Sequence, residues 1–178
     1  MIIYRGMKKN KKQPSKPQVG NTAKDLGVRR CGDVTDTPCS KLCLCWSGRS
    51  NSCKDIPIRK GKVRPNTGGM SVRIDPYMPH FRLPIKKDRW GTFKLDLNDD
   101  KCRVFSLKVD DLPACLRLSG KSNHRLIEPS DPCSFDDFQK NLQGTQHKWK
   151  ELTQCDYKRL VEKLNKNSNE GRNVVVGT

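Results

Sequence analysis

Large hydrophobic side chains are scarce in this chain of 178 residues. Hydrophobic residues make up 33% of the sequence and aromatic residues 6%, which is too little for one dense core to include every segment. No run of 18 apolar residues occurs, so the sequence predicts no membrane span. Lysines follow the first residues, where a secretory signal would have an apolar stretch. We therefore expect a cytoplasmic or nuclear protein, or one carried in a virion.

Catalytic motifs are also lacking. The three histidines, His80, His124 and His147, lie in unrelated contexts without the HxxxH spacing of a helical metal site. Adjacent aspartates, as at positions 99 and 100, point apart on a strand or a helix, which does not suit chemistry with two carboxylates. Cys133 lies near an expected helix start, where the pKa of a thiol can be lowered, but packing is the more common role at such a position. We expect a protein that is not an enzyme.

Acidic residues are rare in the first half of the chain. Residues 1–90 hold 21 lysines and arginines against 6 acidic residues, whereas residues 91–178 hold 15 against 13. Such asymmetry indicates a region that meets a polyanion, joined to an ordinary folded domain. Because lysine and arginine neutralise phosphates without reading sequence, nucleic acid is the favoured partner.

The cations of the first half form three clusters. We interpret residues 1–30 as a basic flexible arm, because prolines interrupt its lysines and no apolar period occurs. In the second cluster, glycines flank cations, which favours either close approach to a phosphate or a solvated turn. In the third, an indole beside cations indicates either stacking on a base or a core residue. The residues expected to contact nucleic acid are Lys8, Lys9, Lys11, Lys12, Lys16, Arg29, Arg30, Arg59, Lys60, Lys62, Arg64, Lys86, Lys87, Arg89 and Trp90.

Five of the nine cysteines lie within 23 residues, in a segment that we assign to residues 31–70. Their spacing is C-x7-C-x3-C-x-C-x7-C, and four thiolates close a tetrahedral Zn²⁺ site. The candidate ligands are Cys31, Cys39, Cys43, Cys45 and Cys53. Disulfides are the alternative, although the odd total leaves one thiol over. We expect the four later cysteines to be small core residues.

The remaining sequence predicts an α+β domain over residues 71–166, with a small antiparallel sheet and two C-terminal helices on one of its faces. Alternating apolar residues predict a hairpin of strands 93–97 and 105–109, a short strand 114–118 and an edge strand 71–74. Ser134 and Thr153, each followed by aspartate three residues later, are the expected helix starts. The polar tail, residues 167–178, is expected to be loose.

Together these features favour a non-catalytic nucleic-acid-binding protein. RNA is favoured over DNA because the cations lie on loop-like sequence and no recognition helix precedes them. An arm joined to a compact domain is the layout of packaging and ribonucleoprotein subunits, and of viral nucleocapsid or silencing-suppressor proteins. The alternatives are a secreted, disulfide-linked ligand with a heparin-binding surface, and a module that docks an acidic protein partner. Self-association is a further expected interaction.

Overall fold

The structure is a computed structural model. It describes residues 1–22, 24–29, 56, 58, 60–76, 85–96 and 103–173, the last seven through their backbone only. The strands are β1 (Ile2–Met7), β2 (Lys62–Val63), β3 (Met70–Arg73), β4 (Ile85–Lys87), β5 (Phe93–Leu95), β6 (Arg103–Lys108), β7 (Leu116–Ser119), β8 (His124–Pro129), β9 (Cys133–Ser134) and β10 (Lys150–Glu151). The helices are α2 (Phe135–Gly144), α3 (Gln154–Asn173) and the single-turn 3-10 helices η2 (Val109–Asp111) and η3 (Gln146–Lys148).

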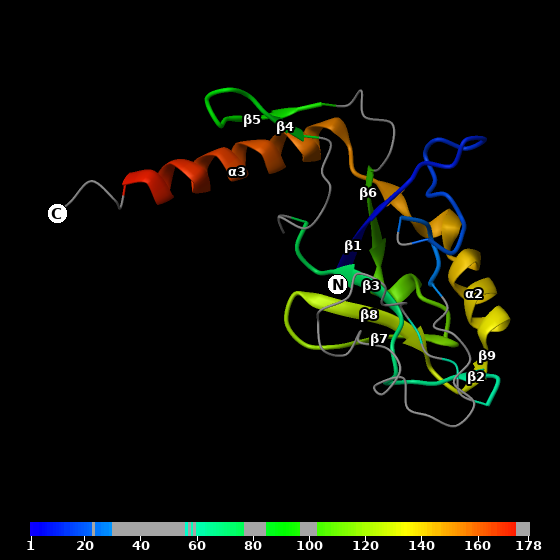
Figure 1. Ribbon diagram of the computed structural model, residues 1–178. Coiled ribbons are helices and arrows are strands. Elements are labelled where there is room, and N and C mark those ends of the chain that lie inside the picture. Colours follow the sequence, from blue (N-terminus) through cyan, green and yellow to red (C-terminus); the bar gives the residue numbers. More distant parts are fainter. Residues whose placement is uncertain are drawn as a thin grey trace.

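An antiparallel sheet of six strands forms the centre of the molecule, in the order β10-β6-β1-β3-β8-β7 (Figure 1). Two smaller pairs, β2 with β9 and β4 with β5, lie outside it. A mixed α/β architecture with an antiparallel sheet and two helices near the C-terminus is confirmed. The strand expected at 71–74 is β3, but it lies inside the sheet between β1 and β8 and not at its edge.

The first strand corrects the prediction of a flexible arm. Residues Ile2–Met7 pair with β6 along their whole length, and Tyr4 is opposite Arg73 of β3 on the other side. Ile3, Arg5 and Met7 alternate as buried residues along this strand. The alternation is that of a strand with one face in the core, so residues 2–7 belong to the folded domain.

The predicted hairpin of strands 93–97 and 105–109 is also wrong. Strand β6 pairs with β1 and β10, whereas β5 pairs with β4. Three consecutive residues of β6, from Arg103 to Phe105, are buried, which is typical of an interior strand covered on both faces. Strand β5 has no fully buried residue, so it fits a two-stranded ribbon at the surface.

The two helices begin where the sequence predicts. The Ser134 hydroxyl accepts the backbone N–H of Asp137 at 3.0 Å and caps α2, while Thr153 and Asp156 exchange the same kind of bonds at the start of α3. Helix α2 ends at Gly144, as expected. Helix α3 continues to Asn173, so the prediction of a loose tail is wrong for residues 167–173.

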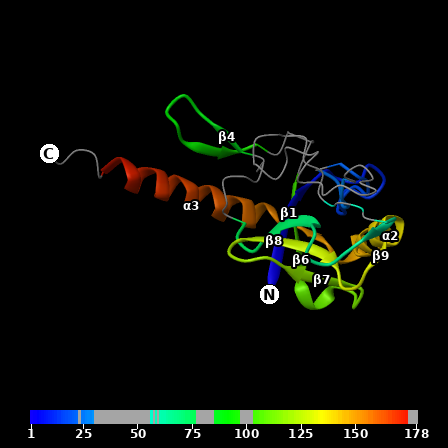
Figure 2. The same ribbon diagram turned by 60° about the horizontal axis from the view of Figure 1, so that its bottom comes forward.

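The helices pack on opposite faces of the sheet, not on one face. Phe138 and Leu142 of α2 join the main core with Ile3 and Phe105. Residues Tyr157 and Leu160 of α3 form a second cluster with Val104, and Tyr4 packs against it. Because neighbouring residues of a strand point to opposite faces, the first cluster lies on one face and the second on the other. Helix α3 then projects beyond the sheet, with the β4–β5 ribbon beside it (Figures 1 and 2).

Candidate nucleic-acid interface

Several of the predicted site residues lie outside the described residues. They are the candidate metal ligands Cys31, Cys39, Cys43, Cys45 and Cys53, and the cations Arg30 and Arg59. Within the described parts of the chain, no group of three histidine, cysteine or acidic residues is arranged to hold a metal ion. The zinc site therefore stays a prediction.

The lysines after β1 lie on a closed loop. The backbone N–H of Asn10 donates to the carbonyl of Lys16 at 2.8 Å, and that of Gln18 donates to the carbonyl of Lys8 at 2.7 Å. The Asn10 side chain accepts the N–H groups of Lys12 and Gln13 and so fixes the tip. This lysine loop, residues 8–18, is thus held to the end of β1 by regular hydrogen bonds.

A hollow of about 640 Å³ opens beside this loop. It is lined by Lys8, Lys9, Asn10, Lys11, Pro14, Gln18 and Lys24, and we call it the lysine hollow. Lys24 comes from the next turn of the chain, because its carbonyl accepts the Lys8 N–H at 2.7 Å. The described residues that line the hollow include four cations and no carboxylate.

Some cations of the lysine loop already have partners. The Lys8 ammonium lies 4.0 Å from the buried carboxylate of Asp25, and that of Lys9 lies 3.5 Å from Glu151. The Lys16 ammonium donates to the carbonyl of His147 at 2.7 Å. Lys16 therefore ties the loop to η3, and it contributes less to a phosphate surface than the sequence predicts.

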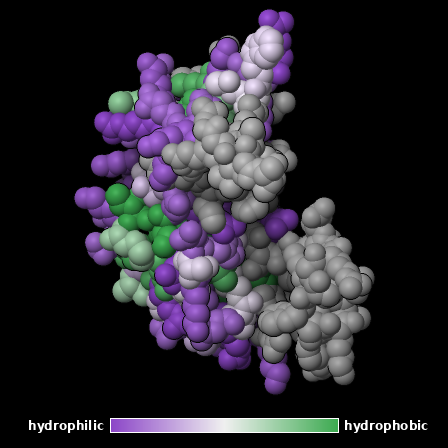
Figure 3. Space-filling view, turned by 90° about the vertical axis from the view of Figure 1, so that its left-hand side faces the viewer, coloured by the Kyte–Doolittle hydropathy of each residue, from purple (hydrophilic) through white to green (hydrophobic). Residues whose placement is uncertain are grey.

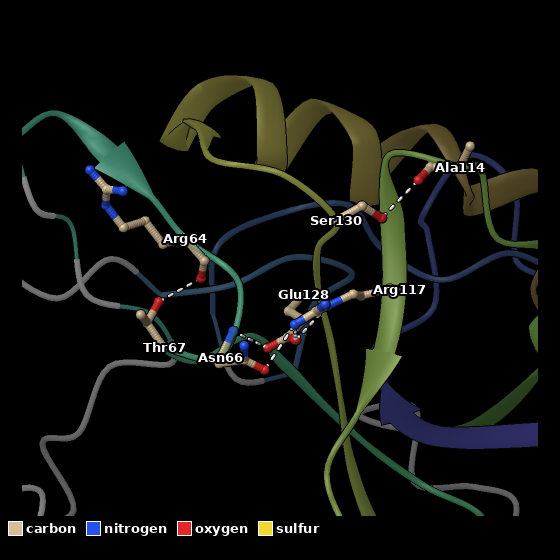
Figure 4. A network of polar contacts seen from close by, with 7 residues as sticks. All are labelled: Arg64, Asn66, Thr67, Ala114, Arg117, Glu128 and Ser130. Carbon is tan, nitrogen blue, oxygen red and sulfur yellow. Dashed lines mark hydrogen bonds and ion pairs between the residues drawn. The ribbon is translucent and has the colours of Figure 1, made fainter.

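The second basic cluster surrounds β2. Lys60, Lys62 and Arg64 are exposed, and β2 pairs with β9 just before α2 begins. Glu128 stabilises the turn that follows: it is fully buried, and its carboxylate accepts the backbone N–H of Asn66 at 3.0 Å (Figure 4). The cations of this cluster are thus accessible to solvent, and the choice between a phosphate contact and a solvated turn stays open.

The buried Glu128 carboxylate needs a positive partner. The Arg117 guanidinium donates to it at 2.8 Å and also to the side-chain oxygen of Asn66 at 2.8 Å. A buried charge that is both paired and hydrogen-bonded is tolerated, whereas an unpaired one is costly. Figure 4 shows that β7, β8 and the turn after β2 meet at this network.

The third cluster forms the β4–β5 hairpin, residues 85–95. Its turn begins at Asp88, whose carboxylate accepts the N–H groups of Trp90 and Thr92 at 2.9 and 3.0 Å. Gly91 takes φ +80°, which a residue with a side chain rarely adopts. The Thr92 N–H bond, with smaller help from Lys94 and Trp90, lowers the pKa of the Asp88 carboxyl.

The tip of the hairpin presents an indole to solvent. The side chain of Trp90 is 70% exposed, and the Arg89 guanidinium lies 4.9 Å from its ring centre. Of the two readings left open for Trp90, the core residue is therefore wrong. An exposed indole with a cation on it has the parts of a stacking platform for a nucleic-acid base.

The two faces of the hairpin differ. On one face, Lys86 and Lys94 are directly opposite each other, and they form ion pairs with Asp96 and Asp88 respectively. Both lysine side chains are more than two-thirds exposed, whereas the carboxylates of Asp96 and Asp88 are 14% and 21% exposed. Solvent screens both pairs from the lysine side, so a phosphate can approach the two ammonium groups while they stay paired.

On the other face, Lys87 lies over the ring of Phe93 at 4.7 Å, and Leu95 packs beside α3. The side-chain amide of Asn165 joins the hairpin to α3: it accepts the Phe93 N–H at 2.8 Å and donates to the Phe93 carbonyl at 3.0 Å. These two bonds satisfy the backbone N–H and carbonyl of Phe93 in β5. The hairpin is thus positioned by the helix.

Helix α3 adds further cations beside the hairpin. They are Lys158, Arg159, Lys163 and Lys166, all exposed. In Figures 1 and 2 the hairpin and α3 lie well apart from the lysine loop, so the described cations form separate surfaces. From the side of α3, hydrophilic residues predominate on the described surface, with small hydrophobic patches between them (Figure 3).

The residues predicted to contact nucleic acid include neither Lys24 and Lys94 nor the four cations of α3. Lys24 is an isolated lysine in the sequence, and only its backbone bond to Lys8 brings it to the hollow. Lys94 alternates with apolar residues on a strand, a signal that predicts its exposure. Arg29, another predicted site residue, is half-buried.

Three cysteines lie within the described residues, namely Cys115, Cys133 and Cys155. Burial, followed by the charges of Asp137, Cys115 and Asp131, raises the pKa of the Cys133 thiol. Cys133 packs against the main core, in agreement with the packing role that the sequence favours at this position. Cys115 and Cys155 are exposed free thiols, so the expectation that the later cysteines are core residues does not hold for these two.

Comparisons with known proteins give one informative result. No protein-family model matches the chain, and no solved structure matches it. It is similar to the nucleotide-binding protein lpg1167 of Legionella pneumophila, with 30% identity over 114 residues, which is 64% of this chain. The match spans 66% of that protein, just under two thirds of its length. None of the helices in the described ranges has the length and hydropathy to cross a membrane.

Proposed function

We propose that this protein is a non-catalytic nucleic-acid-binding protein that holds single strands, preferentially RNA, on the β4–β5 hairpin. The observation that carries the proposal is the exposed indole of Trp90 with the Arg89 guanidinium on its ring. A base stacks on such a ring, while the cations beside it meet the phosphates on either side. The hairpin provides both parts within one short ribbon.

The construction of the hairpin supports a binding role. Leaving a large aromatic side chain in water forfeits the burial free energy that it would supply in a core. Here the turn is fixed by Asp88 and Gly91, so the exposure of Trp90 follows from a defined turn geometry. A preorganised platform lowers the entropy that binding must offset.

The net charge and the relative agree with this proposal. A formal charge of +17 attracts any polyanion, and the relative in Legionella pneumophila is named a nucleotide-binding protein. The preference for RNA rests on where the cations lie. They are on loops and on a two-stranded ribbon, which suit the backbone of an unstacked single strand better than the groove of a duplex. The layout of an arm and a domain no longer supports a packaging role, because residues 2–7 are part of the sheet.

Replacing Trp90 tests the proposal directly. We expect Trp90→Ala to weaken the binding of a single-stranded RNA octamer by about 1–3 kcal/mol, the usual worth of one stacked base. Trp90→Phe should recover part of the loss. Ile2→Ala, at an exposed apolar residue of β1, is the control and should leave affinity unchanged. Fluorescence anisotropy of a labelled octamer gives the affinities of the wild type and the three variants. Equal affinities for Trp90→Ala and the wild type would overturn the proposal.

The salt dependence tests the cations. Each phosphate contact on a single strand contributes about 0.7 to the slope of log affinity against log salt. We expect Lys87→Gln and Arg89→Gln to lower the slope by about that amount each. Lys140→Gln, at an exposed position of α2, removes the same charge elsewhere and should not change the slope. A slope that falls equally in all three variants would assign the effect to net charge alone.

We also propose that the cysteines of residues 31–53 bind Zn²⁺. The free thiols of Cys115, Cys133 and Cys155 leave six of the nine cysteines for disulfides, whereas pairing all but one of the nine requires eight. Native mass spectrometry before and after chelation tests the zinc proposal. One bound zinc, lost on chelation, is the expected result. A metal-free mass that is short by two hydrogens for each disulfide would overturn it.

A further inference from the structure

We infer that the lysine hollow is a separate binding site for the phosphate group of a nucleotide. The ligand is a phosphate monoester, from a free mononucleotide or from the 5′ end of a strand. For the second source, the inference rests on the proposed nucleic-acid binding. For the first it stands alone, since the hollow and the hairpin are different surfaces (Figure 1).

The charge of the hollow selects a dianion. Four lysines converge on it from two segments, the lysine loop and the turn that carries Lys24. Lysine is a compact point charge that suits a terminal phosphate. The positive charges of Lys8 and Lys9 are partly neutralised by Asp25 and Glu151, respectively. Among the contacts of the described residues, Lys11 and Lys24 form no ion pair, so they are available to the ligand.

The size and the remaining lining select more than an inorganic ion. A volume of about 640 Å³ falls in the range of small-molecule sites, about 300–1,000 Å³, and is far larger than one phosphate requires. Pro14 and the methylene stems of the lysines give the hollow an apolar wall. The amides of Asn10 and Gln18 supply polar groups for a sugar or a base. This combination fits a nucleotide.

Backbone hydrogen bonds within the chain hold the framework of the hollow. Four backbone hydrogen bonds hold it: Lys8 to Lys24, Gln18 to Lys8, Asn10 to Lys16 and Leu26 to Gln18, at 2.7–2.8 Å. The side-chain oxygen of Asn10 accepts the backbone N–H groups of Lys12 and Gln13. A fixed cluster of cations is unfavourable by itself, and an anionic ligand relieves the repulsion.

The experiment compares ligands that differ only in the phosphate. Isothermal titration calorimetry at physiological ionic strength measures adenosine 5′-monophosphate against adenosine, and a 5′-phosphorylated RNA octamer against the 5′-hydroxyl octamer. The variant is Lys11→Gln/Lys24→Gln. The matched control is Lys12→Gln/Lys140→Gln, which removes the same charge at exposed residues that do not line the hollow.

We expect at least one phosphorylated ligand to bind more tightly than its phosphate-free counterpart. The hollow variant should lose that preference by about tenfold or more, as when a hydrogen bond to a charged group is removed, and the control should keep it. A preference for the monophosphate assigns the site to free nucleotides, and a preference confined to the octamer assigns it to strand ends.

Two results would overturn the inference: no preference for either phosphorylated ligand, or equal loss in the control. The proposed function is judged separately by the 5′-hydroxyl octamer. If that octamer does not bind but the monophosphate does, the hairpin proposal fails and the hollow stands.

Discussion

The hydroxyl of Tyr157 holds α3 against the sheet, and removing it should be costly. Strand β10 pairs with β6 only at Ser106 and Phe105, so the N–H of Val104 has no strand partner on that side. The Tyr157 hydroxyl accepts this N–H at 2.8 Å inside the second cluster. A side chain of the helix thus continues the hydrogen bonding of the strand.

The structure sets the magnitude of the effect of Tyr157→Phe. The ring and its packing remain, because Tyr157 is 2% exposed and phenylalanine fills the same space. What is lost is the acceptor, which leaves a buried N–H unsatisfied at a cost of about 1–3 kcal/mol. For a chain of this length, each kcal/mol lowers the melting temperature by about 2–4 °C. We expect a decrease of about 2–12 °C.

Calorimetric or circular-dichroism melting of the wild type, Tyr157→Phe and Leu160→Ala provides the assay. Leu160→Ala removes packing from the same cluster and should cost about 2–5 kcal/mol, which calibrates the measurement. A loss below about 0.5 kcal/mol for Tyr157→Phe, within the range of neutral surface substitutions, would refute the role of the hydroxyl.

The same contact predicts a pH dependence. Burial raises the pKa of the Tyr157 phenol, with the nearby Glu151 charge adding to the effect. A group whose pKa is raised by folding stabilises the protein fully below its unfolded pKa, near 10 for tyrosine. That contribution is lost as the pH rises above 10. We expect the stability difference between the wild type and Tyr157→Phe to shrink there, and alkaline absorbance titration to detect a phenol that ionises only on unfolding.

Three further predictions follow from local geometry. Asp88→Ala should loosen the hairpin turn; because the pKa of Asp88 is lowered, its contribution is present above about pH 4 and lost as the pH falls below it, which Trp90 emission reports. Glu128→Gln should destabilise by about 1–3 kcal/mol in urea unfolding, less than breaking a fully buried pair, because the Arg117 side chain is 41% exposed. Gly69→Ala should cost about 1–3 kcal/mol in the same assay, since its Cβ would lie 2.3 Å from the Ile127 carbonyl oxygen.

The elements that the sequence predicts correctly are those with local signals. Helices α2 and α3 begin at Ser134 and Thr153, each with its own capping aspartate three residues later. Strand β3 was predicted from four residues. These signals depend on neighbours along the chain, so they can be read without knowledge of tertiary contacts.

The errors concern partners distant in sequence. Strand β6 alternates like one half of a hairpin, but its neighbours are β1, about one hundred residues earlier, and β10, about forty residues later. Strand β1 was missed because residues 1–30 were interpreted together from their charge. The alternation of Ile3, Arg5 and Met7 is a strand signal, but it covers only a few residues of that segment. Register between distant strands is set by burial, which a single sequence does not show.

The candidate site divides in the same way. Trp90 and its cations are adjacent in sequence, and the prediction of a shared surface at the hairpin agrees with the contact between Arg89 and Trp90. The lysine hollow depends on Lys24 meeting Lys8, and no pattern in the sequence indicates that contact. Lys16 was predicted to contact nucleic acid because it lies in a basic run. In the structure its ammonium group donates a hydrogen bond to the carbonyl of His147 in η3, a contact that the sequence does not indicate.

The position of β1 has a consequence for how the molecule is assembled. In the strand order, β1 joins β10 and β6 on one side to β3, β8 and β7 on the other. Among the described strands it is the only connection between these two groups, so deleting residues 2–7 would divide the sheet in two. Its more extensive pairing is with β6, which begins at residue 103, so more than ninety residues must follow β1 before that pairing can form. Pairing over such a separation is slow, and until it forms β1 has only its contact with β3 to hold it.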